Sequence, residues 1–253
     1  MADSAEPAGS TRVQLCGAFA VELGGRRVDH ALPGRQGRLL LGHLVLTRPR
    51  QVARETLIEV LWGDSPPRAA PAALSVLISK VRAVVGPDVL RGRGTLSLRL
   101  PDPAHVDVEV AASALHTAES AVALGEWRRA WTLSLTAQFV ARRPFLPEAE
   151  GPWAESWRRR LADMHVRALE CYATACLELG GPELPGAERA AKDLLEAAPL
   201  RETGHLLLMR ALAVRGNVAE ALAAYERLRA VLREELGVDP CREVQDAYTE
   251  LLG

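Results

Sequence analysis

The chain has 253 residues, of which 48% are hydrophobic and 25% charged, and its formal net charge is -1. This composition is typical of one large or two ordinary globular domains and excludes a disordered, collagen-like or acidic-tail protein. The sequence has no run of 18 apolar residues and no basic, apolar leader, so we expect neither a membrane span nor a secretory signal. Four scattered cysteines do not form a disulfide framework, which favours a reducing, cytoplasmic compartment.

Charge is distributed unevenly along the chain. Residues 12–105 carry 14 Lys and Arg against 7 Asp and Glu, whereas residues 106–253 carry 17 against 23, so the two segments have formal charges of +7 and -6. Of the 14 positive side chains in the first segment, 13 are arginine, whose planar guanidinium suits phosphate and guanine. The charge therefore favours a nucleic acid as partner of the first segment. A GC-rich genome explains the same arginine enrichment without any such partner.

The first segment predicts strands, then three helices, then a hairpin. Val13–Leu23 alternates apolar with small or polar residues, which indicates a strand, and Gly24-Gly25 predicts a turn into a second strand. Apolar residues at helical spacing, interrupted by proline and glycine, predict the three helices and a closing pair of short strands. The helices are expected from Gly37 into Thr47–Arg50, over Arg54–Trp62 and over about Arg68–Val85, and the strands within Val89–Leu100.

This order of elements is that of a winged helix-turn-helix domain, here residues 12–105, whose third helix enters the major groove of DNA. Ser79 and Arg82 lie one turn apart on the side of that helix that faces away from the core. An ordinary amphipathic helix explains this pattern equally well, but the glycines and arginines of the closing hairpin suit contact with a DNA backbone. The predicted DNA contacts are Arg54, Thr56, Arg68, Ser75, Ser79, Lys80, Arg82, Arg91 and Arg93.

Residues 106–253 are predicted to be almost entirely helical. Ala221 with Tyr225, and Ala187 with Ala191 and then Pro199, match the rhythm of small residue, larger residue and proline found in tetratricopeptide helical hairpins. A generic helical bundle is the alternative. The aromatic side chains of this segment lie in apolar periodic stretches, so we expect them to pack in the core rather than to form a ligand cage. They are Trp127, Trp131, Trp153, Trp157 and Tyr172.

The chain resembles the SARP family, the antibiotic regulatory proteins of actinobacteria, over about residues 12–252. In that family an OmpR-type winged helix precedes a helical "bacterial transcriptional activator" domain, which makes the expected fold mainly α with a second domain over residues 106–253. The two segments that make the resemblance specific are LWGDSPP and EELGVDP, one per domain. The resemblance rests on Leu15–Val28, Gly34–Leu46, Leu57–Pro67, Ile78–Gly86, Gly125–Ser134 and His205–Pro240.

The resemblance implies an activator that binds direct repeats near a promoter and recruits RNA polymerase to a biosynthetic gene cluster. We expect two protomers on tandem DNA repeats. The loop before the third helix projects beside that helix in a winged-helix domain, so Asp64, Ser65 and Arg68 are the predicted contacts with polymerase, in its sigma factor region. The alternative is that Pro66-Pro67 only stop one helix and start the next.

The sequence departs from the family pattern in the recognition helix. Ala72, Ala73 and Leu77 stand where relatives usually carry polar or aromatic residues, and Ala83 replaces a basic residue. Either DNA is read through thymine methyl groups, shape and phosphates, with Val76 and Ala83 as apolar contacts, or specific binding has decayed.

No catalytic, nucleotide-hydrolysing or metal-binding motif is recognisable, so we expect a non-enzymatic protein without a cofactor. Cys171 and Cys176 lie five residues apart, which puts them on different sides of a helix. Two other classes remain open. One is an interaction protein whose helical hairpins bind a partner, and the other is a sensor that binds a small molecule in a cavity between hairpins.

Overall fold

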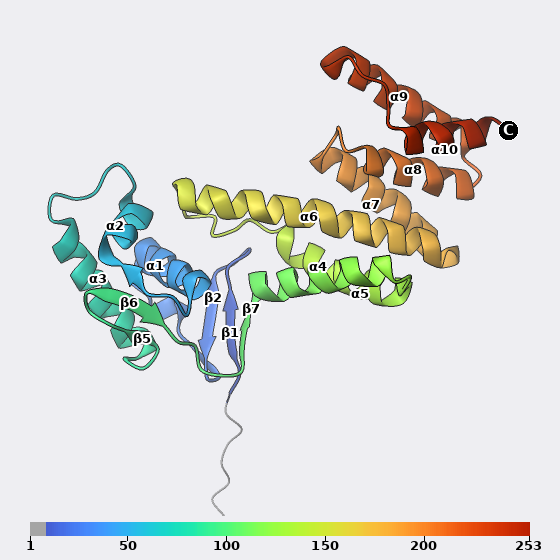
Figure 1. Cartoon of the computed structure of the whole chain (residues 1–253). Coiled ribbons are helices and arrows are strands. Elements are labelled where there is room, and N and C mark those ends of the chain that lie inside the picture. The colour runs from blue at the N-terminus through green and yellow to red at the C-terminus, as the bar shows by residue number, and fades with distance from the viewer. Residues whose placement is uncertain (1–8) are drawn as a thin grey trace, which may run out of the picture. The chain divides into compact units, whose positions relative to one another are not determined.

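The structure, a computed structural model, describes residues 9–253 and divides into two compact units (Figure 1). The first unit comprises residues 9–110 together with residues 143–161, and the second comprises residues 111–142 and 162–253. Two helices, α4 (Asp107–Ala123) and α6 (Pro152–Leu179), contribute residues to both units. The sequence predicts a flexible N-terminus over residues 1–11. Residues 1–8 lie outside the described residues, whereas Thr11 already belongs to a strand.

The first unit opens with a four-stranded sheet formed by β1 (Thr11–Gln14), β2 (Ala20–Leu23), β3 (Arg26–Arg27) and β7 (Ala104–Val106). β1 pairs antiparallel with β2 and parallel with β7, while β2 and β3 pair across the predicted turn at Gly24-Gly25. The prediction of a single strand over Val13–Leu23 is wrong. The chain leaves the ladder after β1 and turns at Gly17, whose φ of +82° suits glycine.

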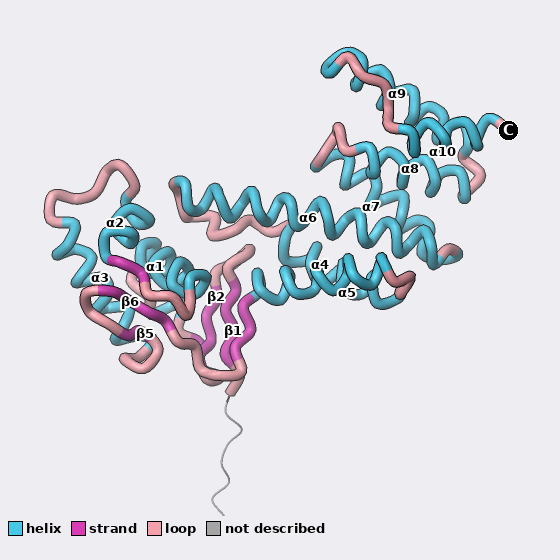
Figure 2. Tube along the Cα trace, in the orientation of Figure 1, coloured by secondary structure: helices cyan, strands magenta, loops and turns pink. Residues whose placement is uncertain are grey.

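Three helices and a second sheet follow, as a winged helix-turn-helix domain requires (Figure 2). Buried leucines from all three helices and from the sheet fill one core, with Leu40, Leu57, Leu74 and Leu96 each fully buried. The third helix begins two residues later than expected, and the predicted closing strands are joined by a short additional strand, β4. The elements are α1 (Gly34–Thr47), β4 (Val52–Ala53), α2 (Arg54–Trp62), α3 (Ala70–Val85), β5 (Leu90–Arg91) and β6 (Thr95–Leu98).

Asp107, at the start of α4, binds the backbone where the chain leaves β1. Its carboxylate accepts hydrogen bonds from the backbone N–H groups of Leu15 at 3.0 Å and of Cys16 at 2.9 Å. It also accepts one from the N–H of Val108 at 2.9 Å in the first turn of its own helix. Burial raises the pKa of Asp107, and these three N–H donors oppose that shift by favouring the charged form.

Residues 143–161, which we call the returning segment, complete the core of the first unit. Phe145 is fully buried, and it forms an isolated antiparallel bridge with Cys16. Backbone hydrogen bonds on either side join the Gly17 N–H to the Pro144 carbonyl at 2.8 Å and the Leu146 N–H to the Leu15 carbonyl at 2.9 Å. The compact unit therefore extends beyond the predicted boundary at residue 105, because its core includes a side chain from about 40 residues further along the chain.

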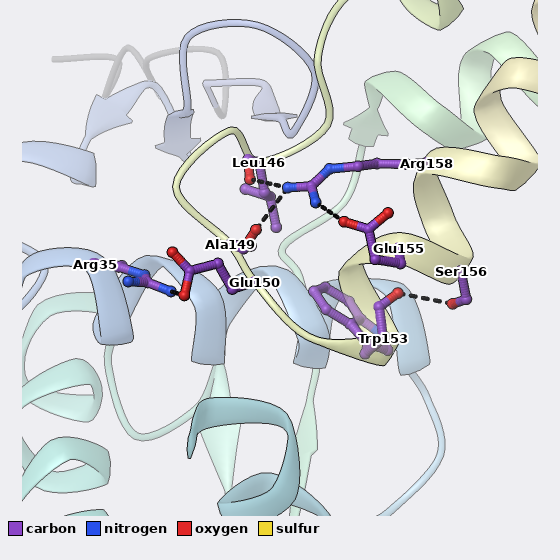
Figure 3. Close-up of polar contacts among 8 residues, drawn as sticks. All are labelled: Arg35, Leu146, Ala149, Glu150, Trp153, Glu155, Ser156 and Arg158. Carbon is purple, nitrogen blue, oxygen red and sulfur yellow. Dashed lines mark hydrogen bonds and ion pairs between the residues drawn. The ribbon is translucent and has the colours of Figure 1, made fainter. Parts of the chain in front are cut away.

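The turn of the returning segment is held by Arg158 of α6 (Figure 3). Its Nη2 atom donates to the carbonyl oxygens of Leu146 at 3.3 Å and Ala149 at 2.6 Å, while Nη1 pairs with Glu155. These contacts support Leu146 in the left-handed backbone region, with φ of +34°, which non-glycine residues rarely adopt. Leu146 packs on α1 at Gly42, where a Cβ atom would lie 3.1 Å from Leu146 Cδ1.

Two ion pairs join the returning segment to α1. Arg38 Nη1 lies 2.8 Å from Glu148 Oε1, and Arg35 Nη2 lies 3.1 Å from Glu150 Oε2. All four side chains are exposed, so each pair contributes at most about 1 kcal/mol. The buried Phe145 and Leu146 side chains therefore account for most of the stability of this attachment.

The second unit consists of helices, and it confirms the predicted helical-hairpin domain. Gly216, with φ of +83°, connects α8 and α9 in a tight turn, and the predicted small residues Ala187, Ala191 and Ala221 are buried between packed helices. None of the helices described over residues 9–253 is long and apolar enough to cross a membrane. Besides α4 and α6, the unit contains α5 (Trp127–Ala141), α7 (Leu184–Ala197), α8 (Glu202–Val214), α9 (Val218–Leu236) and α10 (Arg242–Leu252).

Most of the aromatic side chains in the chain's second half pack against another aromatic ring. The five predicted core aromatics are half-buried rather than buried, however, and Trp127 has no such contact among residues 9–253. Tyr225 of α9 stacks on Tyr248 of α10 with ring centroids 3.9 Å apart, and Trp131 lies 6.1 Å from Tyr172. In the first unit, Phe145 stacks on Trp157 at 5.8 Å. Contacts at these separations stabilise helix packing.

We predict that Phe145→Ala destabilises the protein by about 3–5 kcal/mol, because it leaves a cavity where the returning segment enters the core. Urea unfolding measures the change. The matched control is Phe139→Ala in α5. Phe139 is 58% exposed and its ring lies under Arg142, so we expect a loss below about 1 kcal/mol. Equal losses in the two variants would show that Phe145 is not part of a tightly packed core.

His43 in α1 makes stability depend on pH. It is buried against Trp153, with ring centroids 5.0 Å apart, and among the described residues neither ring nitrogen has a hydrogen-bond partner. Burial without a partner lowers the pKa of His43 from 6.5 to about 4. The unfolded chain therefore binds a proton at a higher pH than the folded chain does, and the folded state loses stability as the pH falls below about 6.5.

We predict that this one histidine makes the protein about 3 kcal/mol less stable at pH 4 than at pH 7. His43→Leu removes that contribution. The unfolding free energy of the variant minus that of wild type should therefore rise by about 3 kcal/mol between pH 7 and pH 4. Urea unfolding at several pH values provides the measurement. His116→Leu, at an exposed position of α4, is the control and should follow the wild-type pH profile. Parallel profiles for His43→Leu and wild type would contradict the assignment.

Candidate nucleic-acid interface

The two sides of α3 differ as the sequence predicted. Leu74, Ile78 and Val81 are buried in the core of the first unit. The other side carries small and polar side chains, and Val76 there is 55% exposed. The exposed residues of this side are Ala72, Ser75, Val76, Ser79, Lys80 and Ala83.

Arg82, in the last turn of α3, binds the wing, which is the hairpin formed by β5, β6 and the turn of residues 92–94. Its Nε atom donates to the carbonyl oxygen of Leu90 at 3.0 Å, and its Nη2 atom donates to that of Gly92 at 2.6 Å. The side chain is half-buried. The structure therefore gives this predicted DNA contact two partners within the protein.

Arg54, at the first position of α2, also has partners within the protein. Its Nη2 atom donates to Ser75 Oγ at 2.6 Å and to the Pro71 carbonyl at 3.1 Å, and its Nη1 atom donates to the Arg93 carbonyl at 3.3 Å. Ser75 in turn donates to the Pro71 carbonyl at 2.8 Å. Arg54 thus connects the start of α2, the first turn of α3 and the wing.

The turn of the wing requires glycine at position 92. Gly92 has φ of +91°, and a Cβ atom there would lie 2.0 Å from the Thr95 carbonyl oxygen. Gly94 has ordinary φ and open space around it. The two glycines of the predicted cationic turn therefore differ, and only the first is needed for the backbone conformation.

Three cationic side chains on this face are exposed and have no partner within residues 9–253: Arg68 before α3, Lys80 on α3 and Arg93 in the wing. Arg91 is exposed as well, but its Nε atom donates to the Asp88 carbonyl at 2.9 Å and its Nη2 atom lies 3.8 Å from the Asp88 carboxylate. The predicted DNA contacts therefore divide into side chains with hydrogen-bond or ion-pair partners inside the protein and side chains that are exposed to solvent. Thr56 and Ser79 belong to the exposed group.

The loop between α2 and α3 projects from the unit. Asp64, Ser65 and Arg68 are exposed, and Gly63 at the end of α2 turns the chain with φ of +53°. Trp62 is half-buried. The backbone is ordered by two short-range hydrogen bonds, from the Ser65 N–H to the Trp62 carbonyl and from the Ala70 N–H to the Pro67 carbonyl.

The sequence analysis missed the strand that supports the wing from the other side. β4 pairs antiparallel with β6, placing Val52 opposite Leu96, and Thr95 Oγ1 lies 2.9 Å from Gln51 Oε1. A strand of two residues is too short to show alternation of apolar and polar side chains. The buried Val52, isolated between Pro49 and the first residue of α2, was the only available signal.

The first unit also contains a cavity of about 390 Å³ between the β1–β2 connection, the start of α1 and residues 146–149. Arg35 and Arg38 line it, but each is paired with a glutamate of the returning segment. The wall is therefore electrically compensated, which gives the cavity little preference for an anionic ligand. Among the described residues, no group of three or more His, Cys, Asp or Glu is arranged to hold a metal ion.

Comparison with known proteins identifies the family. The model of the bacterial transcriptional activator domain matches residues 106–252, and the regulatory protein AfsR of Streptomyces griseus is 34% identical over 218 residues. The chain belongs to the SARP family of transcriptional regulators. The AfsR match covers 86% of this SARP chain but 22% of AfsR, so the chain spans about a fifth of the length of that relative.

Two further matches extend over almost the whole chain. The transcriptional regulatory protein MoaR1 of Mycobacterium tuberculosis is 25% identical over 98% of this SARP chain and 81% of its own length. The solved structure of EmbR from M. tuberculosis, in complex with a low-affinity phosphopeptide, superposes with a TM-score of 0.81 at 24% identity. That superposition covers 96% of this chain and 65% of the EmbR chain, and it shows the shared fold of winged helix and helical domain.

Proposed function

We propose that this SARP protein is a sequence-specific DNA-binding transcription activator of a secondary-metabolite biosynthetic gene cluster. The winged helix of residues 12–105, completed by the returning segment, is the DNA-binding part. In this proposal α3 lies in the major groove and the wing lies along the neighbouring backbone. The observation that carries the proposal is the exposed face of α3, on which Ser79 and Lys80 stand beside a cationic wing in a segment of charge +7.

The chemistry of this face suggests how the sequence is read. Lys80, Arg68 and Arg93 supply contacts with phosphates, which fix the orientation of the protein on DNA. The exposed side chain of Val76 and the methyl group of Ala83 suit thymine methyl groups, and Ser79 is able to bond to base edges or phosphates. Few polar side chains face the groove, so DNA shape contributes more than direct hydrogen bonding to bases.

Two protomers bind tandem repeats in this proposal. Direct repeats spaced by one helical turn, about 10–11 base pairs, place both recognition helices on one side of the duplex. Residues 106–253 carry a charge of -6, so the helices of the second unit, which lie outside the returning segment, are repelled by DNA and serve to arrange the protomers on it.

The loop before α3 supplies the contact with the sigma factor region of RNA polymerase. Asp64 and Ser65 are exposed beside the recognition helix, and neither has a side-chain partner within residues 9–253. Arg68 lies close enough to the start of α3 to contact phosphate as well as polymerase. A loop ordered by its own backbone hydrogen bonds is a suitable contact surface because little entropy is lost on binding.

We predict that the full chain binds a mixed-sequence 30-base-pair duplex with an affinity that falls steeply between 50 and 300 mM salt. Lys80→Ala should weaken binding by about 1 kcal/mol and reduce the slope of log affinity against log salt by about 0.9, the value for one phosphate contact. Fluorescence anisotropy measures both quantities. Lys192→Ala is the matched control, because this other lysine pairs with Glu188 in the second unit and should change neither. Binding that is absent or independent of salt would exclude the DNA proposal.

We predict that Asp64→Ala leaves DNA affinity within about 0.5 kcal/mol of wild type but lowers transcription in a reconstituted assay. Footprinting on promoters of the neighbouring genes first identifies an occupied site, and transcription is then compared at equal occupancy. Asp102→Ala, which removes another exposed acid of the first unit, serves as the control and should transcribe normally. Normal transcription by Asp64→Ala at full occupancy would place the activating contact elsewhere.

A further inference from the structure

The wing is too small to hold its position through its own backbone. Its two strands pair at two positions, Leu90 with Leu98 and Arg91 with Ser97, and one further backbone hydrogen bond joins the Arg99 N–H to the Val89 carbonyl at 2.9 Å. β4 adds two more pairs to β6 and leaves β5 at the edge of the sheet. Hairpins of this length are marginally stable alone in water, so additional contacts must fix the turn of residues 92–94.

The guanidinium of Arg82 supplies such contacts. Its Nε and Nη2 atoms lie on one edge of a rigid plane and bind two carbonyl oxygens of the wing, those of Leu90 and Gly92. Bidentate pairing with guanine requires two donors on one edge as well, so Arg82 cannot make it with this edge without releasing the wing. If Arg82 released the wing, the carbonyl oxygens of Leu90 and Gly92 would lose the hydrogen bonds from its guanidinium.

Arg54 supports the same turn from α2. Its Nη1 atom donates to the carbonyl of Arg93, the residue that follows Gly92. Consecutive carbonyls of the turn are thus bound by guanidinium groups from two different helices. The Arg93 side chain remains exposed at the tip.

We infer that Arg82 is a positioning residue of the DNA interface, which holds the wing against α3 while exposed neighbours such as Lys80 and Arg93 make the contacts with DNA. This inference rests on the proposed DNA-binding function. Loss of Arg82 then weakens DNA binding without removing a phosphate contact. Lysine does not replace it, because an ammonium group lacks the planar pair of donors that spans the Leu90 and Gly92 carbonyls.

The experiment compares Arg82→Ala, Arg82→Lys and Lys80→Ala in the full chain. Hydrogen exchange is measured without DNA: exchange of residues 90–98 reports on the wing, and exchange of α1 reports on the core. Fluorescence anisotropy with the mixed-sequence duplex measures DNA affinity as a function of salt. We expect both Arg82 variants to exchange at least 10-fold faster in the wing, with α1 unchanged. They should bind DNA about 10-fold more weakly with the wild-type salt slope. In Lys80→Ala, hydrogen exchange in the wing should equal that of wild type, and the slope of log affinity against log salt should be smaller by about 0.9.

Two results would overturn the inference. One is unchanged wing exchange in Arg82→Ala. The other is a salt slope reduced by about 0.9 in Arg82→Ala together with wild-type affinity in Arg82→Lys, which is the pattern of a direct phosphate contact. If wild type does not bind the duplex at all, the proposed function fails, and accelerated wing exchange in both Arg82 variants still decides whether Arg82 positions the wing.

Discussion

The first unit depends on how the chain satisfies the backbone groups between β1 and β2. After β1 the chain turns away from its sheet, and the N–H groups of Leu15, Cys16 and Gly17 lose their strand partners. Asp107 accepts from the first two, and Pro144 accepts from the third. Because buried backbone groups need partners, this turn ties the start of α4 and the returning segment to the winged helix.

That constraint explains why the winged-helix unit includes residues from far along the chain. Phe145 fills the core beside the same turn, and Leu146 accepts a strained backbone conformation to pack on α1 at Gly42. Arg158 and two surface ion pairs then hold the turn in place. The buried apolar contacts supply most of the stability, and the polar contacts make the arrangement specific.

The candidate interface of the first unit uses arginine in two ways. Arg54 and Arg82 are donors to backbone carbonyls within the protein, and they order the wing and the first turn of α3. Arg68 and Arg93 remain exposed with Lys80. The net charge of the segment therefore overstates the number of side chains free to meet phosphate. In the DNA complex that we propose, a rigid wing fixes the register on DNA and so offsets the small number of polar residues on α3.

The sequence alone determined the order of the three helices in the first unit, the apolar side of α3, the helical second half and the family, because each depends on local periodicity or on a contiguous motif. It also predicted that Ser79 and Lys80 lie on the exposed side of α3, which the structure shows. Only the tertiary structure decided that Phe145 belongs to the first core, that β4 supports the wing, and that Arg82 and Ser75 have partners within the protein. Those facts depend on contacts between distant residues, such as Arg54 with Ser75 or Leu15 with Leu146, and no local pattern encodes them. Exposure and charge select candidate contacts, but hydrogen-bond geometry decides which of them are free to bind.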